Sequence, residues 1–245
     1  MKRVIIAILK KIMGEENYTV WRLKKNEEEI RQKINKEIKE DWKDKSLCFD
    51  IGANIGNYSM AYSYFFKKVV AFEPQEKCFN ILKKRFSDKK NIILEKKAIG
   101  KTTGLEKIKI YNETTISSMS SQPPSIERFK KKIKLQKIET VEVETISKMI
   151  SKYGKPDFIK IDVEGYEYEV IGGLNEPISY IQFECNWPEN KKMLHDCLKH
   201  ITNLGNYSIN FDSIEANSAT EFIEKSEQLF HENVLSMDVL CSIKK

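Results

Sequence analysis

The sequence predicts an α/β fold built around a mostly parallel sheet. From about residue 46 onward, short apolar runs alternate with helix-like segments, which is the pattern of consecutive β-α-β units. A turn that contains two glycines separates the first apolar run from the helix that follows it. The length of 245 residues suits one such domain with a full core. We therefore expect an α/β domain over 46–245, preceded by an N-terminal helical extension over 1–45.

The N-terminal extension has the spacing of an amphipathic helix. Ile30, Ile34, Ile38 and Trp42 recur every fourth residue in a highly charged segment, as in a helix that packs one stripe on a core. The apolar run at 4–9 is too short to cross a bilayer, and no small-residue cleavage site follows it. We expect a cytoplasmic protein without a transmembrane segment. The first residues are either a frayed terminal helix or a basic amphipathic helix that contacts a membrane surface.

Seven apolar runs are predicted strands, and most of the segments between them are predicted helices. The strands are expected at about 46–51, 68–73, 91–95, 157–162, 178–184, 207–211 and 236–243. The helices are expected at 57–66, 75–87, 145–152, 166–173 and 189–203. Residues 97–143 do not fit a single crossover helix, because apolar residues such as Ile108 and Ile110 alternate as in strands. An inserted hairpin and loop is therefore predicted at about 101–140.

The residue types that form disulfides or bind metals show no organised pattern. Five cysteines are scattered without a Cys-x-x-Cys pair, which indicates reduced thiols, and the three histidines have no metal-binding spacing. We predict no metal site from these residues. The net charge of +6 and the basic run at 128–137 fit either an anionic partner or a solvated loop or helix face.

The strongest local signal is the turn from Asp50 to Gly56, which lies between an apolar strand and a helix. Its glycines permit a tight turn and a close approach of the backbone to a ligand, and Asn54 tolerates left-handed geometry. Glu73 ends the next strand, where a carboxylate can accept hydrogen bonds from ribose hydroxyls. Asp50 suits a cationic amino group, unless it only ties down the turn. S-adenosylmethionine carries an ammonium, a carboxylate and a ribose, so it is the predicted ligand.

A second acidic segment ends the strand at 157–162. Ligands of open α/β sheets bind at the carboxyl ends of strands, near the switch in strand order, so Asp162 and Glu164 should face the same crevice. If the strand end is extended, the two carboxylates point to one side, where their proximity raises one pKa and creates a base. The sequence therefore predicts an acidic, reactive end of the ligand site.

Four segments resemble the FkbM family of methyltransferases, over roughly 46–186. They are FDIGANIGNYS at 49–59, AFEP at 71–74, KAIG at 97–100 and FIKIDVEGYEYEVIGGL at 158–174. The resemblance implies a Rossmann-like class I methyltransferase fold, whose mostly parallel seven-stranded sheet has an antiparallel last strand. It also implies S-adenosylmethionine as donor and a hydroxyl acceptor on a sugar or a secondary metabolite. The cofactor contacts that it implies are Asp50, Gly52, Asn54, Gly56 and Glu73, with Ala98 and Ile99 along the adenine.

Methyl transfer to a hydroxyl is an in-line displacement that requires an oriented acceptor oxygen and a route for its proton. We predict Asp162 or Glu164 as the proton acceptor, with Glu184 as a third carboxylate in the same crevice. As an alternative, Asp162, Glu184 and Asn186 are similar to the oxygen ligands that hold Mg²⁺ in catechol-type O-methyltransferases. The expected partner is a hydroxyl-bearing substrate such as a sugar or a glycolipid.

Other functions stay open on the sequence alone. The basic run at 128–137 would suit an RNA methyltransferase, but no recognisable RNA-binding module accompanies it, so a nucleic-acid partner is not expected. Other N-methyltransferases often carry an Asp/Asn-Pro-Pro-aromatic segment after the fourth strand, which this sequence lacks. A non-catalytic protein that binds an adenosine ligand is the remaining alternative.

Overall fold

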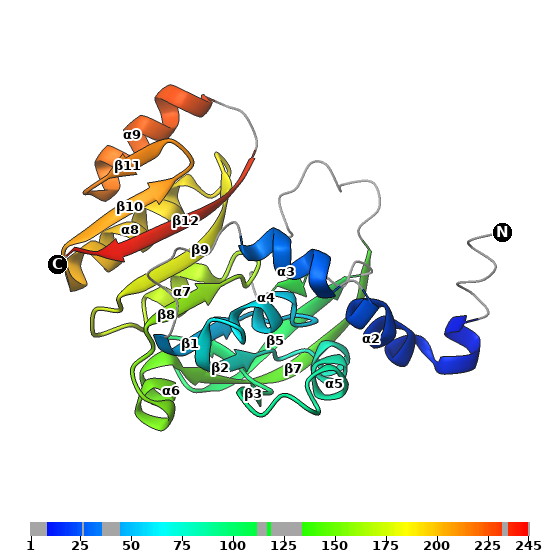
Figure 1. The fold of residues 1–245 in the computed structure, drawn as a ribbon. Coiled ribbons are helices and arrows are strands. Elements are labelled where there is room, and N and C mark those ends of the chain that lie inside the picture. The colour runs from blue at the N-terminus through cyan, green and yellow to red at the C-terminus, as the bar shows by residue number, and fades with distance from the viewer. Residues whose placement is uncertain are drawn as a thin grey trace.

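The predicted alternation of strands and helices is present in the computed structural model, which describes residues 9–25, 27–35, 45–111, 117–118, 134–231 and 235–244 (Figure 1). Its labelled helices are α2 (Glu15–Lys25), α3 (Glu27–Asn35), α4 (Asn57–Tyr62), α5 (Glu76–Arg85), α6 (Ile146–Tyr153), α7 (Glu167–Ile171), α8 (Lys191–Leu204) and α9 (Ala219–Phe230). The strands are β1 (Lys45–Ile51), β2 (Phe66–Phe72), β3 (Ile92–Glu95), β4 (Ala98–Gly100), β5 (Gly104–Tyr111), β6 (Ser117–Ser118), β7 (Leu135–Thr145), β8 (Phe158–Ile161), β9 (Tyr180–Trp187), β10 (Tyr207–Phe211), β11 (Ile214–Ala216) and β12 (Leu235–Ile243).

The central sheet has the order β11-β10-β12-β9-β8-β1-β2-β3. The five strands β9, β8, β1, β2 and β3 are parallel to one another, whereas β12 runs antiparallel to both β9 and β10. All seven predicted strands are present, and the antiparallel last strand is confirmed. The expected number of strands in the sheet is wrong by one, because the three-residue strand β11 pairs with β10 at the edge. A strand that short leaves no clear alternation in the sequence.

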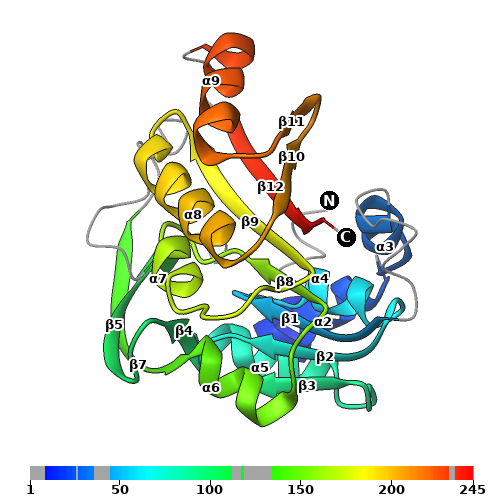
Figure 2. The same ribbon diagram turned by 90° about the vertical axis from the view of Figure 1, so that its left-hand side faces the viewer.

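Helices cover both faces of the central sheet (Figure 2). Because successive side chains of a strand point to opposite faces, Phe49 and Ile51 of β1 join one core and Cys48 joins the other. The larger core contains residues of α6, α7, α8 and α9. The smaller core contains residues of α4 and α5. The carboxyl ends of β1, β2 and β8 therefore open between two packed layers, which is where ligands of open α/β sheets bind.

The predicted insertion is a hairpin with its own small core. β5 and β7 are antiparallel, and together with β4 and β6 they form a second sheet in the order β4-β7-β5-β6. Its inner face buries a cluster of five apolar residues, which are Ala98, Ile108, Ile110, Val141 and Val143. The residues at 128–133, which hold most of the predicted basic run, lie outside the described residues. The hairpin thus stands beside β4, which follows directly on the third strand of the central sheet.

The described part of the N-terminal extension packs on the helices next to the glycine turn. α2 lies against α5, where Lys84 Nζ and Glu16 Oε2 are 2.6 Å apart. α3 lies against α4, and the Tyr64 hydroxyl donates a hydrogen bond of 2.8 Å to Glu27. The predicted apolar positions 38 and 42 lie outside the described residues.

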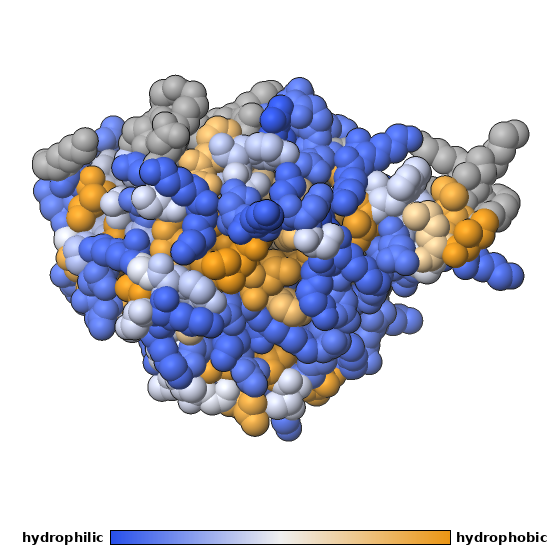
Figure 3. All heavy atoms as spheres, turned by 60° about the horizontal axis from the view of Figure 1, so that its bottom comes forward, coloured by the Kyte–Doolittle hydropathy of each residue, from blue (hydrophilic) through white to orange (hydrophobic). Residues whose placement is uncertain are grey.

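The surface agrees with the high content of charged residues. The face shown in Figure 3 is mostly hydrophilic, with smaller hydrophobic areas between the charged side chains. Charged residues make up 32% of the sequence. None of the described helices has both the length and the apolar character that crossing a bilayer requires.

Candidate active site

The turn after β1 brings the end of that strand against the end of β8. Gly52 has φ +87°, and a Cβ atom there would lie 1.9 Å from the backbone oxygen of Asp162. The amides of Gly52 and Ala53 both donate to the carbonyl of Phe72, at 3.0 Å. Asn54 has φ 51°, so the predicted left-handed geometry is confirmed. Only glycine at position 52 allows this approach of the turn to β8.

Glu73 ties the turn to the end of β2. Its carboxylate accepts hydrogen bonds of 2.8 Å from the amides of Asn54 and Gln75, one on each oxygen. The side chain is buried, and burial raises the pKa of Glu73 to about 7, although the two amides partly offset this effect. Each carboxylate oxygen has a further lone pair. Glu73 can therefore hold the turn and still accept hydrogen bonds from a ribose in the adjacent cavity.

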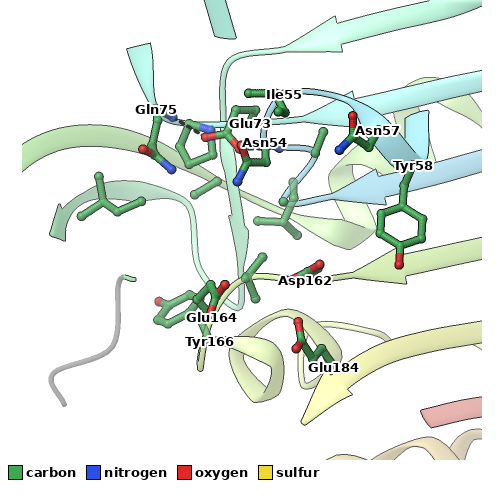
Figure 4. Close-up of a pocket in the computed structure, with 17 residues that line it drawn as sticks. Asn54, Ile55, Asn57, Tyr58, Glu73, Gln75, Asp162, Glu164, Tyr166 and Glu184 are labelled. Carbon is green, nitrogen blue, oxygen red and sulfur yellow. Dashed lines mark hydrogen bonds between the residues drawn. The ribbon is translucent and has the colours of Figure 1, made fainter. Parts of the chain in front are cut away.

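A cavity of about 260 Å³ lies between the turn and the acidic segment after β8 (Figure 4). Its volume is near the lower end of the range of roughly 300–1,000 Å³ for small-molecule sites. The predicted site residues that line it are Gly52, Asn54, Glu73, Ala98, Ile99, Asp162, Glu164 and Glu184. Residues from the glycine turn, from β4 and β9, and from the segments directly after β2 and β8 thus meet at one place, as the sequence predicts for a shared ligand site.

Two sides of the cavity differ in chemistry, and we name them the turn wall and the acidic wall. The acidic wall consists of Asp162, Glu164 and Glu184, and the turn wall consists of Gly52, Ala53, Asn54, Ile55, Asn57 and Glu73–Gln75. In Figure 4, Asn54, Glu73 and Gln75 lie across the cavity from Asp162 and Glu184. A ligand between the walls would meet the glycine turn and the Glu73 carboxylate on one side and three carboxyl groups on the other.

The acidic wall is built on a turn, so the prediction of an extended strand end is wrong. β8 ends at Ile161, and Glu164 has φ 54°, which is left-handed. Glu167 holds this turn, since its buried carboxylate accepts hydrogen bonds from the amides of Gly165, at 3.0 Å, and Val163, at 3.4 Å. The sequence analysis did not single out Glu167, because its role depends on a turn that alternation does not reveal. Asp162 and Glu164 nevertheless both line the cavity.

Burial and repulsion by neighbouring carboxylates raise the pKa values of Glu164 and Glu184. Burial is the largest cause for Glu164, whose pKa rises to about 9, and Asp162, Glu184 and Glu167 add to the shift. Burial and Asp162 raise the pKa of Glu184 to about 7, while a hydrogen bond from the Ser236 hydroxyl acts in the opposite direction. Near pH 7, Glu164 therefore carries a proton and can donate a hydrogen bond.

Two predicted cofactor contacts, Asp50 and Gly56, do not line the cavity. The Asp50 side chain is buried behind the turn and accepts a hydrogen bond from the Ser59 hydroxyl on α4. Burial raises the pKa of Asp50 to about 6. A Cβ atom on Gly56 would lie 2.6 Å from the ring of Phe86, so this glycine permits α4 to pack on α5. Both residues support the turn from behind in this structure, where Asp50 makes a structural hydrogen bond, and its contact with the ammonium stays a prediction.

Some lining residues carry no signal that the sequence analysis used. Ile108 comes from the inserted hairpin, Tyr166 precedes α7, and Tyr58 belongs to α4. Their hydrophobic character is compatible with an ordinary core position, so only the tertiary arrangement shows that they reach the cavity. Tyr58 could have been found by its place in the helix that follows the glycine turn.

The arrangement does not favour the Mg²⁺ alternative. Asp162 and Glu184 line the cavity, but Asn186 does not. Within the described ranges, no group of three or more His, Cys, Asp or Glu residues has an arrangement that could hold a metal ion.

Comparisons with known proteins identify the family of this chain. The family model described as "Methyltransferase FkbM domain" matches residues 50–232, which is most of the chain. A search of curated proteins finds no match.

Similar solved structures belong to methyltransferases from several organisms. A precorrin-6y C5,15-methyltransferase from Geobacter metallireducens GS-15 has 12% identity and a TM-score of 0.45, covering 88% of this chain and 89% of that one. An rRNA methylase from Streptococcus thermophilus has 12% identity and a TM-score of 0.44, covering 83% of this chain and 90% of that one. Because these identities and TM-scores are low, the fold is assigned from the order of the strands in the sheet. By the family match, this chain belongs to the FkbM family of S-adenosylmethionine-dependent methyltransferases.

Proposed function

We propose that this methyltransferase transfers the methyl group to a hydroxyl oxygen of a sugar, a glycan or a secondary metabolite. The acidic wall is the observation that carries the proposal. It places three carboxyl groups, Asp162, Glu164 and Glu184, at the side of the cavity opposite the turn wall. Carboxylates accept hydrogen bonds from hydroxyl groups and can take up the proton that an alcohol loses when it is methylated.

The turn wall contains the groups that would hold the cofactor. The carboxylate of Glu73 would accept hydrogen bonds from the ribose, and the backbone of Gly52 and Ala53 would lie along the methionine end. Ala98 and Ile99, which are buried beside the inserted hairpin, would contact the adenine. When bound, the cofactor supplies a methyl group on a sulfonium sulfur, which is the electrophile of the transfer.

The acidic wall would orient the acceptor and remove its proton. Asp162 would accept the hydroxyl proton as the new carbon–oxygen bond forms. Glu164, whose high pKa keeps it protonated near pH 7, would donate a hydrogen bond to another oxygen of the acceptor. Glu184 would complete the contacts from β9. A polyhydroxylated acceptor offers both donors and acceptors for such a wall, which favours a sugar.

The same wall disfavours an anionic acceptor. A phosphate group placed beside Asp162 and Glu184 would meet like charge in a partly buried cavity, where repulsion is weakly screened. This observation supports a neutral sugar over an RNA backbone. If the acceptor is a glycolipid, we also propose that the N-terminal residues contact the membrane surface.

To test this proposal, the protein is incubated with S-adenosylmethionine labelled in the methyl group. The acceptors are the glycan, lipid, small-molecule and RNA fractions of a cell extract, each assayed separately. We expect the label to enter a glycan or small-molecule fraction as a methyl ether, identified by mass spectrometry of the product. The Asp162→Asn protein provides the background. Label in an amine, or in RNA, would contradict the proposal. Binding of S-adenosylhomocysteine without transfer to any fraction would instead support a non-catalytic binding protein.

A further inference from the structure

A fully buried lysine lies directly behind the acidic wall. Lys160 belongs to β8 and is 1% exposed. Its Nζ atom is 2.8 Å from Asp238 Oδ1 and 3.7 Å from Asp162 Oδ2, and it lies 5.0 Å from the ring centre of Tyr58. A buried ammonium group is costly unless it is paired, so these contacts account for its presence.

The strand register places this lysine at the centre of the site without exposing it to the cavity. Lys160 pairs in register with Asp50 of β1, and Asp162 follows two residues later along the chain. On the other side, Asp238 of β12 pairs in register with Glu184 of β9. Lys160 itself is not among the residues that line the cavity. Lys160 therefore acts on the reaction through the groups that it contacts, of which Asp162 and Tyr58 line the cavity.

Around Lys160, carboxyl groups outnumber the buried cations. Three carboxyl groups form the acidic wall, whereas the buried cations in the described ranges are Lys160 and Arg85. Arg85 lies elsewhere and donates to the carbonyl of Ile55, at 2.6 Å. Among the described residues of the acidic wall, Asp162 is the one that forms an ion pair with a buried cation. The positive charge of Lys160 thus acts most strongly on this one member of the wall.

We propose that Lys160 is a positioning residue that orients Asp162 through their ion pair, so that Asp162 is the member of the acidic wall that accepts the proton of the acceptor. This inference rests on the proposed function and names the residue that selects the base. Asp238 anchors the ammonium group from the opposite side. Burial alone lowers the pKa of Lys160, but Asp162 and Asp238 outweigh burial and the net shift is upward, so the lysine keeps its charge.

Asp162 and Lys160 have different parts in the proposed transfer. The hydroxyl proton moves to a carboxylate oxygen of Asp162 while the acceptor oxygen forms its bond to the methyl carbon, and the bond between that carbon and the sulfur breaks with its electron pair on sulfur. Lys160 neither gains nor loses a proton in this step. After transfer, the proton of Asp162 leaves to solvent, and the Lys160–Asp162 pair forms again.

The test compares the pH dependence of kcat/KM in the full-length wild type and in Lys160→Met, which removes the charge but keeps a similar length. Loss of a nearby opposite charge raises a carboxylate pKa by roughly 1–3 units. We expect the acidic limb of the profile to move upward by about that amount, so that activity lost near neutral pH returns at alkaline pH. Affinity for S-adenosylhomocysteine, measured by calorimetry, should stay near the wild-type value.

Two further variants separate the charge of Lys160 from its packing. Asp238→Asn leaves the Lys160–Asp162 pair in place, so its acidic limb should not move upward. If Lys160→Met fails to fold because Asp238 loses its partner, the double variant Lys160→Met/Asp238→Leu removes both charges and should show the same upward shift. Replacement of a buried ion pair by apolar residues is often neutral for stability.

Two results would overturn the inference. One is an unchanged acidic limb in a folded, cofactor-binding Lys160 variant. The other is a loss of activity that is equal at every pH, which indicates a structural role alone. Failure of the proposed function would look different, because the wild type itself would then form no methyl ether.

Discussion

The two walls of the cavity use the same residue type in opposite ways. Glu73 in the turn wall and Glu164 in the acidic wall are both glutamates whose pKa is raised mainly by burial. Two backbone amides stabilise the ionised form of Glu73, and its pKa rises only to about 7. Neighbouring carboxylates destabilise the ionised form of Glu164, and its pKa rises to about 9. In the proposed function, this difference suits the turn wall to cofactor binding and the acidic wall to proton transfer.

The walls also differ in what supports them. The turn wall depends on the backbone, since Gly52 has a positive φ and its amide donates to the carbonyl of Phe72. The acidic wall depends on side chains, since Glu167 holds its turn and Lys160 pairs with Asp162. Substitutions in the turn wall should therefore act on cofactor affinity, and substitutions in the acidic wall should act on turnover.

The largest expected effect is that of Asp162→Asn, which tests the acidic wall. Turnover should fall on the order of 10²–10⁴-fold, the usual contribution of a general base. The fold and the affinity for S-adenosylhomocysteine should be retained, because the cofactor contacts lie in the turn wall. Steady-state kinetics and calorimetry on the same preparation measure both quantities. Near-normal turnover would show that Asp162 is not the base.

Gly52→Ala tests the turn wall. The new Cβ atom would lie 1.9 Å from the backbone of Asp162, and a positive φ at a residue other than glycine costs about 1–3 kcal/mol. We expect S-adenosylhomocysteine to bind at least roughly 10-fold more weakly in calorimetry. Gly56→Ala is the matched control, since its φ is +81° but its Cβ would meet Phe86 and not the cavity.

The control has its own expected result. Gly56→Ala should lower the free energy of unfolding in a denaturant titration, with a smaller effect on cofactor affinity than Gly52→Ala. If both variants reduced affinity equally, the distinction between residues that line the cavity and residues that support it would fail.

Glu73→Ala should weaken cofactor binding by roughly 1–3 kcal/mol, which is the usual loss for hydrogen bonds to a charged group. The effect should appear in the affinity for S-adenosylhomocysteine, whereas turnover at saturating cofactor should change less. Calorimetry at pH 8, where Glu73 is ionised, gives the clearest reading because burial raises its pKa to about 7. An unchanged affinity would show that Glu73 does not bind the ribose.

The smallest expected effect concerns stability and pH. The pKa of Glu164 is raised to about 9 in the folded protein from an ordinary value of 4.5, so the folded state keeps a proton that the unfolded state has lost. The stability associated with this proton is complete below pH 4.5 and is lost as the pH rises to 9. Glu164→Gln should reduce the decline of the free energy of unfolding between pH 7 and 9. For one group, this decline is at most about 1.4 kcal/mol per pH unit.

Urea titrations across this pH range measure the decline. Glu224→Gln, at an exposed position on α9, is the matched control and should leave the decline unchanged. An equally steep decline in Glu164→Gln would mean that Glu164 does not hold the proton in the folded state.

Much of the turn wall could be predicted because its signals are local. Asp50 to Gly56 and Glu73 stand at strand ends, and the left-handed geometry of Asn54 follows from its place between glycines. The parallel sheet and the inserted hairpin could also be predicted, since alternation and the lack of helical spacing are visible along the chain. The edge strand β11 and the turn after β8 could not, because three residues or a single left-handed glutamate leave no periodic pattern.

The sequence by itself determined which segments become strands, where the backbone must turn sharply and which family the chain resembles, because these properties depend on residues that are close along the chain. Only the tertiary structure decided which side chains reach the cavity. It turned Asp50 toward Ser59, brought Ile108 from the hairpin to the cavity and placed Asp238 of the last strand against Lys160. These contacts join residues that are distant in sequence, and the strand order and register that create them arise only when the whole sheet has assembled.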